Sequence, residues 1–418
     1  MTFPQRYYLV NFLYILSVSF TKTTFYLYLS ECHKIPREDI LFIFAVFNLA
    51  VMVLEVPTSA IGEAIGPRKS FLIGMGIKLS AASLFLFGRH FWQFCAAEII
   101  SALAVTFVSG SLNAWLMSRL SEESSKPCDS PSIFIVGKRI NVIALAFGGL
   151  AGAISGEFHL GIPWAMVVLG SFFTLVVASF VLTESGPSGT WKKKEKVYRK
   201  WQWDTFLYGY KISLSNKILL VLLFNGFLIS FALSSPKIFW LPFLKSHFNK
   251  DMWFLGYMWV GIMGIQFVGT FGIDSLIRSA GSVLRLKLLL TVFSVLMLLG
   301  LALFKHIDSI LPFVGFYFLL EWLKPYHHAL ILSLVHQETK DIEGGRVTIL
   351  SIGNLMENFG NAIGLLFAAS VCKFQSLTFA WTMSTLLYAL IVPCYVYLVA
   401  REKISWPAQK IEEGSLPA

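Results

Sequence analysis

Charged side chains are scarce in this chain of 418 residues. Asp, Glu, Lys and Arg make up 14% of it, whereas hydrophobic residues make up 56% and the mean hydropathy is +0.67. A soluble protein carries roughly 25% charged residues. This deficit excludes an ordinary soluble domain and predicts that lipid is the solvent for most of the chain.

Polar interruptions are also few, so apolar runs of about 20 residues recur, the length with which a helix crosses ~30 Å of hydrocarbon. These runs do not alternate as barrel strands do, and a helix satisfies its own backbone polar groups in lipid. We therefore predict an all-α membrane protein. Its twelve expected spans are 7–29, 40–60, 70–87, 91–115, 139–158, 162–182, 218–240, 253–271, 288–304, 310–334, 346–370 and 378–399.

Only one long polar stretch divides the spans, six on each side of it. The predicted organisation is a six-helix bundle at 1–183, a basic cytoplasmic linker at 184–217, a second six-helix bundle at 218–400 and a cytoplasmic tail at 401–418. The linker mixes basic residues with Trp and Tyr, which suits contact with anionic lipid of the inner leaflet. Alternatively, the linker is solvated, and its positive charge keeps it on the cytoplasmic side. Both interpretations fit the sequence equally well.

Cysteine is sparse and shows no pattern. The five residues Cys32, Cys95, Cys128, Cys372 and Cys394 match no metal or disulfide framework. A G-x-x-x-x-G-K-[ST] loop for ATP is also missing from the sequence. We expect no metal and no cofactor, and no ATP-driven pumping by this chain alone.

The net charge of +10 has an explanation in the membrane. If the N-terminus is cytoplasmic, most lysines and arginines fall on the cytoplasmic side, as the positive-inside rule requires. We therefore predict that both termini are cytoplasmic and that nucleic acid is not a partner.

The most informative stretch joins the second and third expected spans, Glu55-Val56-Pro57-Thr58-Ser59-Ala60-Ile61-Gly62-Glu63-Ala64-Ile65-Gly66-Pro67-Arg68-Lys69. Pro57 removes a backbone donor and is expected to loosen the end of its helix. Gly66 permits a tight turn, and Arg68 begins the next helix on the cytoplasmic face. Such a short hinge between two membrane helices indicates a moving part.

This stretch resembles the E-x-P-T-G … A-D-x-x-G-R-K hinge of the major facilitator superfamily, and the resemblance covers nearly the whole chain. It implies two parallel six-helix halves, related as a pseudo-repeat, around a central cavity. It also implies a cytoplasmic latch that favours the outward-open state. The residues that fall in this gate are Glu55, Pro57, Glu63, Gly66, Arg68, Arg119, Arg139 and Arg346. Ser59, Glu63, Ala64 and Pro67 depart from the pattern, which predicts a weaker latch.

Charges inside the expected spans are candidate functional residues, because a charge at the centre of a membrane helix costs about 2.5–3.5 kcal/mol. In the superfamily, helices 1, 4, 7 and 10 line the cavity, so the resemblance implies that Lys22 and Lys237 attract an anionic solute. Alternatively, each lysine snorkels to the outer headgroups. Glu98 lies at a depth comparable to Lys22, and an ion pair between them either couples transport or is static.

The tenth expected span carries the densest polar cluster. Glu321, Lys324 and His328 are spaced i, i+3 and i+7, which predicts one helical face, and Pro325 is expected to bend the helix. This face could bind substrate or carry a proton. A polar packing network without transport chemistry is the alternative.

The sequence thus predicts a secondary active transporter of a small, anionic solute that works by alternating access and is coupled to protons or to exchange. We expect a monomer in a cell membrane, the inner membrane of a bacterium. A proton-coupled multidrug efflux pump is one alternative, although Lys22 counts against it. A multi-span acyl or glycosyl transferase using His327 or His328 is another, but no loop domain is present to hold a polar donor.

Overall fold

The computed structural model describes residues 1–123, 130–183, 211, 215–248, 251–269, 271, 273–303, 310–338 and 345–405. These residues form helices and turns, and none of them lies in a strand. Cys128 and most of the predicted linker and tail lie outside this description.

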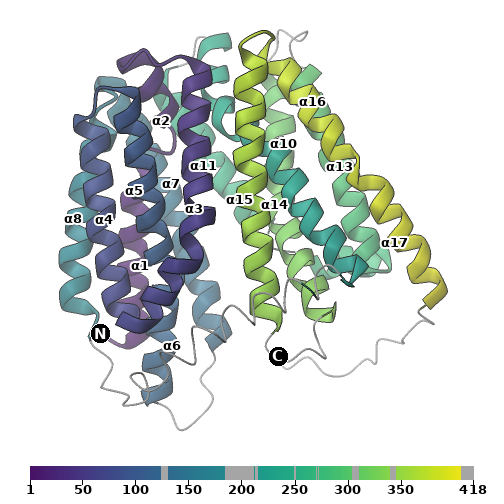
Figure 1. Ribbon diagram of the computed structural model, residues 1–418, viewed down its shortest axis with the longest axis horizontal. Coiled ribbons are helices and arrows are strands. Elements are labelled where there is room, and N and C mark those ends of the chain that lie inside the picture. The colour runs from purple at the N-terminus through teal and green to yellow at the C-terminus, as the bar shows by residue number, and fades with distance from the viewer. Residues whose placement is uncertain are drawn as a thin grey trace.

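The first group of helices, which we call the N-terminal half, lies on the left of Figure 1. It comprises α1 (Phe3–Ser19), α2 (Phe25–Leu27), the π-helix η1 (Tyr28–Cys32), α3 (Arg37–Ile65), α4 (Pro67–Phe87), α5 (Phe91–Val108), α6 (Ser111–Glu123), α7 (Ser130–Phe158) and α8 (Ile162–Val181). We call the end of the bundle where α1 begins the lower end, as Figure 1 draws it, and the end where α3 begins the upper end.

The second group, the C-terminal half, continues from residue 215. It comprises α10 (Lys217–Phe248), α11 (Met252–Val268), α12 (Ile273–Ala280), α13 (Val283–Leu303), α14 (Ile310–Glu338), α15 (Gly345–Cys372), α16 (Leu377–Ala389) and α17 (Ile391–Ser405). The last of these ends at the lower end of the bundle, as α1 begins there (Figure 1).

The two halves meet along two helix pairs, α3 with α15 and α7 with α11. Glycines allow the second pair to approach closely. The Trp259 ring lies against Gly149, where a Cβ atom would come within 2.3 Å of it. The Trp259 indole Nε1 also donates a hydrogen bond of 2.8 Å to the Leu145 carbonyl oxygen. This interface therefore has both close packing and a directed polar contact.

The sequence predicts one continuous helix for the first expected span, but the structure breaks it. α1 ends at Ser19, turns occupy 20–24, and helix resumes at Phe25. The break packs on glycines of α7: a Cβ atom at Gly152 would lie 1.7 Å from the Phe20 carbonyl oxygen. Because only glycine leaves that space, Gly152 allows the break to pack closely against α7.

Nine helices in the described part of the chain are long and apolar enough to cross a membrane. The first, eighth and tenth expected spans are not among them. α1 and α11 have 17 residues each, and α14 carries the polar cluster around Glu321, which lowers its hydropathy. The all-helical membrane architecture is as predicted, whereas the count of twelve spans and the pseudo-repeat stay predictions.

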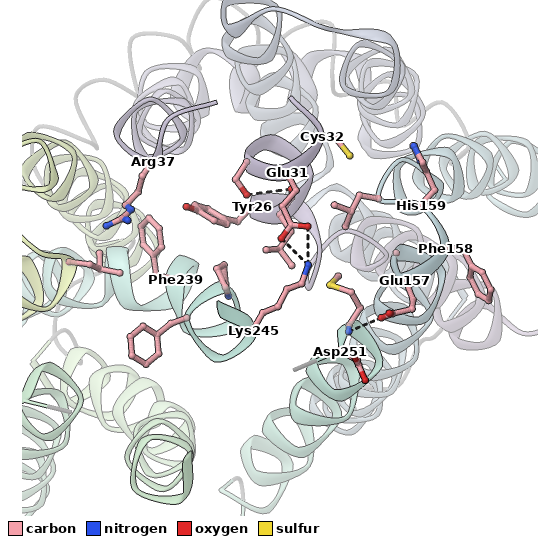
Figure 2. Close-up of a pocket in the computed structure, with 18 of the residues that line it drawn as sticks. Tyr26, Glu31, Cys32, Arg37, Glu157, Phe158, His159, Phe239, Lys245 and Asp251 are labelled. Carbon is pink, nitrogen blue, oxygen red and sulfur yellow. Dashed lines mark hydrogen bonds and ion pairs between the residues drawn. The ribbon is translucent and has the colours of Figure 1, made fainter. Parts of the chain in front are cut away.

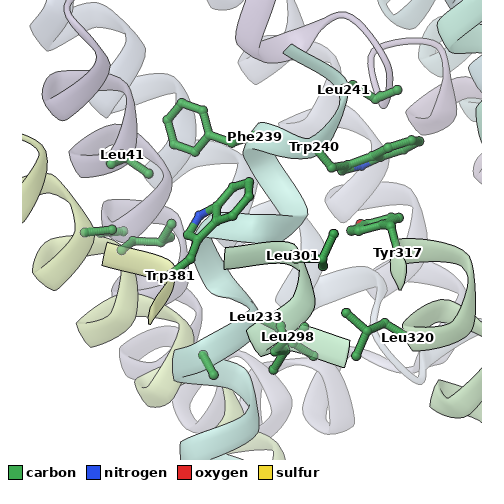
Figure 3. Close-up of a cluster of buried hydrophobic side chains, with 14 of the residues drawn as sticks. Leu41, Leu233, Phe239, Trp240, Leu241, Leu298, Leu301, Tyr317, Leu320 and Trp381 are labelled. Atoms are coloured by element: carbon green, nitrogen blue, oxygen red, sulfur yellow. The ribbon is translucent and has the colours of Figure 1, made fainter. Parts of the chain in front are cut away.

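An aromatic and aliphatic core fills the upper part of the C-terminal half (Figure 3). Trp240 stacks on Tyr317 with ring centroids 4.6 Å apart. The Trp381 indole donates a hydrogen bond of 2.9 Å to the buried Ser235 hydroxyl. Leu41 of α3 joins this cluster from the N-terminal half, so the halves are packed together near the upper end.

Candidate functional site

The N-terminal half holds one buried carboxylate between two lysines from different helices. Glu98 of α5 is only 4% exposed. Its charge interacts with those of Lys78 on α4 and Lys22 in the break after α1. Within the described residues, Glu98 makes no hydrogen bond and no direct ion pair. We call Lys22, Lys78 and Glu98 the N-terminal charge cluster.

Lys22 differs from its neighbours in the break by its exposure. Thr21, Thr23 and Thr24 are buried, whereas Lys22 is exposed. The Thr23 hydroxyl donates a hydrogen bond of 3.0 Å to the Gly149 carbonyl oxygen of α7, which fixes the backbone next to the lysine. Lys22 thus combines an accessible side chain with a charge close to the buried Glu98.

The C-terminal half holds a larger set of charges. Lys237 of α10 is exposed, and its charge interacts with those of Lys324, Glu321 and Glu357. Lys287 of α13 is fully buried, and its charge also interacts with that of Glu357 on α15. We call Lys237, Lys287, Glu321, Lys324 and Glu357 the C-terminal charge cluster.

Glu321 is the most tightly held acid of this cluster. It is 3% exposed and forms an ion pair with Lys324 one turn later on α14. The Gln266 amide of α11 donates to its other oxygen at 2.5 Å. Both carboxylate oxygens therefore have a donor, and Glu321 and Lys324 share one helical face, as their spacing in the sequence predicts.

The buried histidine of α14 is His327 and not the predicted His328. Its Nδ1 lies 2.7 Å from the Lys287 ammonium, and its Nε2 lies 2.9 Å from the Ser294 hydroxyl. Ser294 donates its own hydrogen to the Leu290 carbonyl oxygen at 2.9 Å. The Ser294 oxygen must then accept from Nε2–H, which leaves Nδ1 to accept from the ammonium. His328 is exposed, and its charged neighbours are Lys138 and Lys287.

A cavity of about 250 Å³, which we call the lower cavity, lies where α3 and α5 of the N-terminal half face α15 of the C-terminal half. Each half contributes one carboxylate to it, Glu55 and Glu357. The other lining residues are Phe47, Val51, Val105, Thr106, Ser109, Asn354, Asn358 and Asn361. It is a space shared by both halves, with polar and apolar side chains in its lining.

A second cavity of about 1000 Å³, the upper cavity, lies at the upper end between the halves (Figure 2). The Lys245 ammonium binds both oxygens of Glu31 across it, at 2.8 and 2.9 Å. The Glu157 carboxylate accepts a hydrogen bond of 2.7 Å from the Met252 backbone N–H. These contacts join the N-terminal half to the C-terminal half.

Below the upper cavity, two aromatic rings meet across the halves. Tyr26 and Phe239 have ring centroids 4.8 Å apart in an edge-to-face arrangement, and both line the cavity in Figure 2. Lys22 precedes Tyr26 by one turn, and Lys237 precedes Phe239 by two residues. The two lysines therefore lie close to this aromatic contact along their own segments.

The residues of the predicted gate fall on several helices, namely α3, α4, α6, α7 and α15, and on the turn at Gly66. Gly66 has a φ of 90° and connects α3 directly to α4, as the hinge predicts. α3 continues through Pro57 and ends at Ile65, and the loosening expected at Pro57 stays a prediction. The Arg68 guanidinium donates to the Ser179 carbonyl oxygen of α8 at 2.9 Å.

Two further gate residues, Arg119 and Arg139, differ in their exposure. Arg119 is buried with its guanidinium 5.8 Å from the Phe3 ring centroid, whereas Arg139 is exposed. The side chains of Glu63 and Arg346 lie outside the described residues. The latch therefore stays a prediction.

Sequence reasoning missed two lysines of the clusters. Lys78 lies in the middle of an apolar span, and its charge alone could have marked it as a candidate. Lys287 falls just before the expected ninth span, at 288, so it resembled a residue at the membrane surface. The helix begins earlier, at Val283, and this carries Lys287 into the protein core.

Comparisons with known proteins agree with this architecture. The profile of the Major Facilitator Superfamily matches residues 7–365. No individual curated protein gives a significant match. The chain is similar in structure to the nucleoside transporter NupG, with a TM-score of 0.75 and 13% identity over 96% of this chain and 99% of that one.

Two further solved structures share the fold. One is a POT family transporter in complex with a thioalcohol-conjugated peptide, with a TM-score of 0.71, 12% identity and 96% of both chains covered. The other is the human organic anion transporter MFSD10, with a TM-score of 0.59 and 14% identity over 94% of this chain and 98% of that one. At such identities the likeness is one of fold. Together with the profile match over most of its length, it identifies this chain as a member of the Major Facilitator Superfamily and a multi-pass membrane transporter.

Proposed function

We propose that this chain moves a small anionic solute across a cell membrane by alternating access, with coupling to protons or to a counter-solute. The observation that carries the proposal is the pair Lys22 and Lys237, one from each half. Both side chains are exposed, and the charge of each interacts with at least one carboxylate of its own half. A lysine that snorkels to headgroups moves away from such carboxylates, so these charge interactions favour positions inside the bundle.

The balance of charge in the two clusters favours an anion. They hold five lysines, Lys22, Lys78, Lys237, Lys287 and Lys324, against three glutamates, Glu98, Glu321 and Glu357. Excess positive charge in a membrane protein is costly unless a counter-charge is present. A solute anion between Lys22 and Lys237 would supply this counter-charge.

The contacts between the halves support a state that is closed at the upper end. The Tyr26–Phe239 ring contact and the Glu31–Lys245 ion pair bridge the halves there. Release of the solute on that side requires these contacts to separate. In the opposite state, the lower ends of the halves would close, with the gate residues around Gly66 and Arg68 as the proposed latch.

The orientation follows from the sequence. We infer that the lower end, which carries the N-terminus, faces the cytoplasm, because most lysines and arginines then lie inside. The same proposal includes a monomer in the bacterial inner membrane and two six-helix halves, at 1–183 and 218–400. It also includes contact of the linker with anionic lipid.

Uptake into proteoliposomes tests the proposal. Purified protein is reconstituted, and the uptake of radiolabelled mono- and dicarboxylates, organic phosphates and one lipophilic cation is measured with and without a pH gradient. We expect uptake of at least one anion and its loss in Lys22→Ala, because the ammonium group that meets the anion is gone. Uptake of the lipophilic cation alone would contradict the proposal and favour efflux of drugs.

Lys373→Ala is the matched control, because Lys373 is exposed in the turn after α15, away from both clusters. It should transport like the unmodified protein. Unchanged anion uptake by Lys22→Ala, in a protein that inserts normally, would remove Lys22 from the site.

A further inference from the structure

The lower cavity differs from the lysine clusters in the sign of its charge. Its lining includes two carboxylates, Glu55 from α3 and Glu357 from α15, and no lysine, arginine or histidine among the described residues. The proposed function uses neither acid to hold a solute. A space with two acids from opposite halves therefore suits a positively charged group.

Two hydrogen bonds beside the cavity leave acceptors free for a ligand. The Asn358 amide donates one N–H to the Asn354 carbonyl oxygen at 3.0 Å, which leaves its amide oxygen and its second N–H. The Thr106 hydroxyl donates to the Leu103 carbonyl oxygen at 2.9 Å, which leaves only lone pairs for a ligand. One oxygen of Glu55, Oε2, is buried without any hydrogen-bond partner in the described structure.

Such a lining selects a group that carries positive charge and several N–H donors. An ammonium group has three donors and no acceptor, so it complements carboxylate, amide and hydroxyl oxygens at once. Hydrogen bonds between charged partners are also about twice as strong as neutral ones. A carboxylate or phosphate would meet two carboxylates here, and no lysine, arginine or histidine among the described lining residues.

The cavity adjoins the lysines of the proposed anion site. Glu357 lines the cavity, and its charge interacts with those of Lys237 and Lys287. The cavity volume of about 250 Å³ also exceeds by far the ~30 Å³ that one water molecule occupies in the liquid. A negative pole and a positive pole thus lie next to each other, with room for an organic group at the negative one.

We propose that the solute carries an ammonium group as well as its anionic group, and that the ammonium group binds between Glu55 and Glu357 in the lower cavity. The solute is then an amino acid-like zwitterion or an amino-bearing anion. Its anionic end meets Lys237, and Lys22 faces that end from the N-terminal half. This inference rests on the proposed function and narrows its class of substrate.

The binding contact also explains how the solute could hold the halves together. Glu55 belongs to the N-terminal half and Glu357 to the C-terminal half, so one ammonium group between them offsets the repulsion of two acids across the interface. Without the ligand, both carboxylates line the same cavity. Solute binding would therefore stabilise the existing contact of α3 with α15.

Matched pairs of probes test the inference on the full-length protein in detergent or in proteoliposomes. The zwitterions glycine, β-alanine and γ-aminobutyrate are compared with acetate, propionate and butyrate, which have the same chain lengths but no ammonium group. Butylamine and NaCl, with choline chloride as the salt control, complete the set. We expect at least one zwitterion to bind ten times more tightly than its matched anion, and butylamine and sodium to bind weakly.

Glu55→Gln and Glu357→Gln should each weaken binding of that zwitterion by roughly tenfold or more, as expected when one charge-assisted hydrogen bond is lost. Glu55→Gln should leave the binding of the matched anion unchanged within about twofold, because Glu55 belongs to neither charge cluster. Glu38→Gln is the control, since it makes the same substitution near the upper end of α3, outside the cavity lining.

The outcomes separate this inference from the proposed function. If the plain anions bind as tightly as the zwitterions and both Gln variants bind the zwitterions normally, the proposed ammonium site is wrong. The proposal of an anion transporter then stands. If butylamine or sodium binds alone and depends on Glu55, the cavity is an independent cation site and the inference is overturned. If neither anions nor zwitterions bind, the proposed function fails as well.

Discussion

The two charge clusters differ in how many direct partners their buried acids have. In the C-terminal half, Glu321 receives donors on both oxygens, from Lys324 and from Gln266. In the N-terminal half, Glu98 is as deeply buried, but only the longer-range charges of Lys22 and Lys78 balance it. One acid is fully paired, and the other is not.

This difference separates structural charges from exchangeable ones. A buried charge without a direct partner costs several kcal/mol, so it persists where a ligand or proton supplies the missing contact. The paired acid Glu321 and the Lys287–His327–Ser294 network hold α11, α13 and α14 together. We therefore expect substitutions in the C-terminal network to act on stability, and substitution of Glu98 to act on transport.

The largest expected effect is on the stability of the C-terminal half. His327→Leu leaves the fully buried Lys287 ammonium without its acceptor, which should cost about 3–5 kcal/mol. The midpoint of thermal unfolding in detergent should fall clearly. The double variant Lys287→Met/His327→Leu removes both partners and should recover most of the loss. A double variant that is less stable than His327→Leu would contradict this account of the network.

A smaller effect on stability, but a clear one on uptake, is expected for Glu98→Gln. The substitution keeps the shape of the side chain and breaks no hydrogen bond of the described structure, so unfolding should change by less than about 1 kcal/mol. Anion uptake should fall by roughly tenfold, because Lys22 and Lys78 lose the charge that balances them. If Glu98→Gln destabilises the protein as much as His327→Leu does, and its folded fraction takes up the anion normally, the two clusters do not differ as proposed.

Much of the helical architecture follows from the sequence alone. Apolar runs predict the membrane helices, and Gly66 predicts the tight turn between α3 and α4, which has a positive φ. The i, i+3 spacing of Glu321 and Lys324 predicts that they share one helical face, and in the structure they form an ion pair. These features are local, since each depends on residues within one or two helical turns.

Features set by distant contacts could not be predicted in this way. The break at 20–24 packs closely against Gly152, far along the chain in α7. The choice between His327 and His328 depends on the rotation of α14 against α13, because adjacent helical residues point about 100° apart. The Glu31–Lys245 and Tyr26–Phe239 contacts join the two halves. Their partners are far apart in the chain, so no local pattern predicts that they meet.

Labelling of single cysteines tests the central claim most directly, namely that Lys22 and Lys237 line one water-accessible space between the halves. The five native cysteines are replaced, and Lys22→Cys and Lys237→Cys are each exposed to a water-soluble, membrane-impermeant thiol reagent. Phe180→Cys is the lipid control, because Phe180 is 82% exposed on the outer face of α8. Labelling of both lysine positions from the same side, with slower labelling when the transported anion is present, is the predicted result. If both remain as unreactive as Phe180→Cys, the lysines face lipid and the account is contradicted.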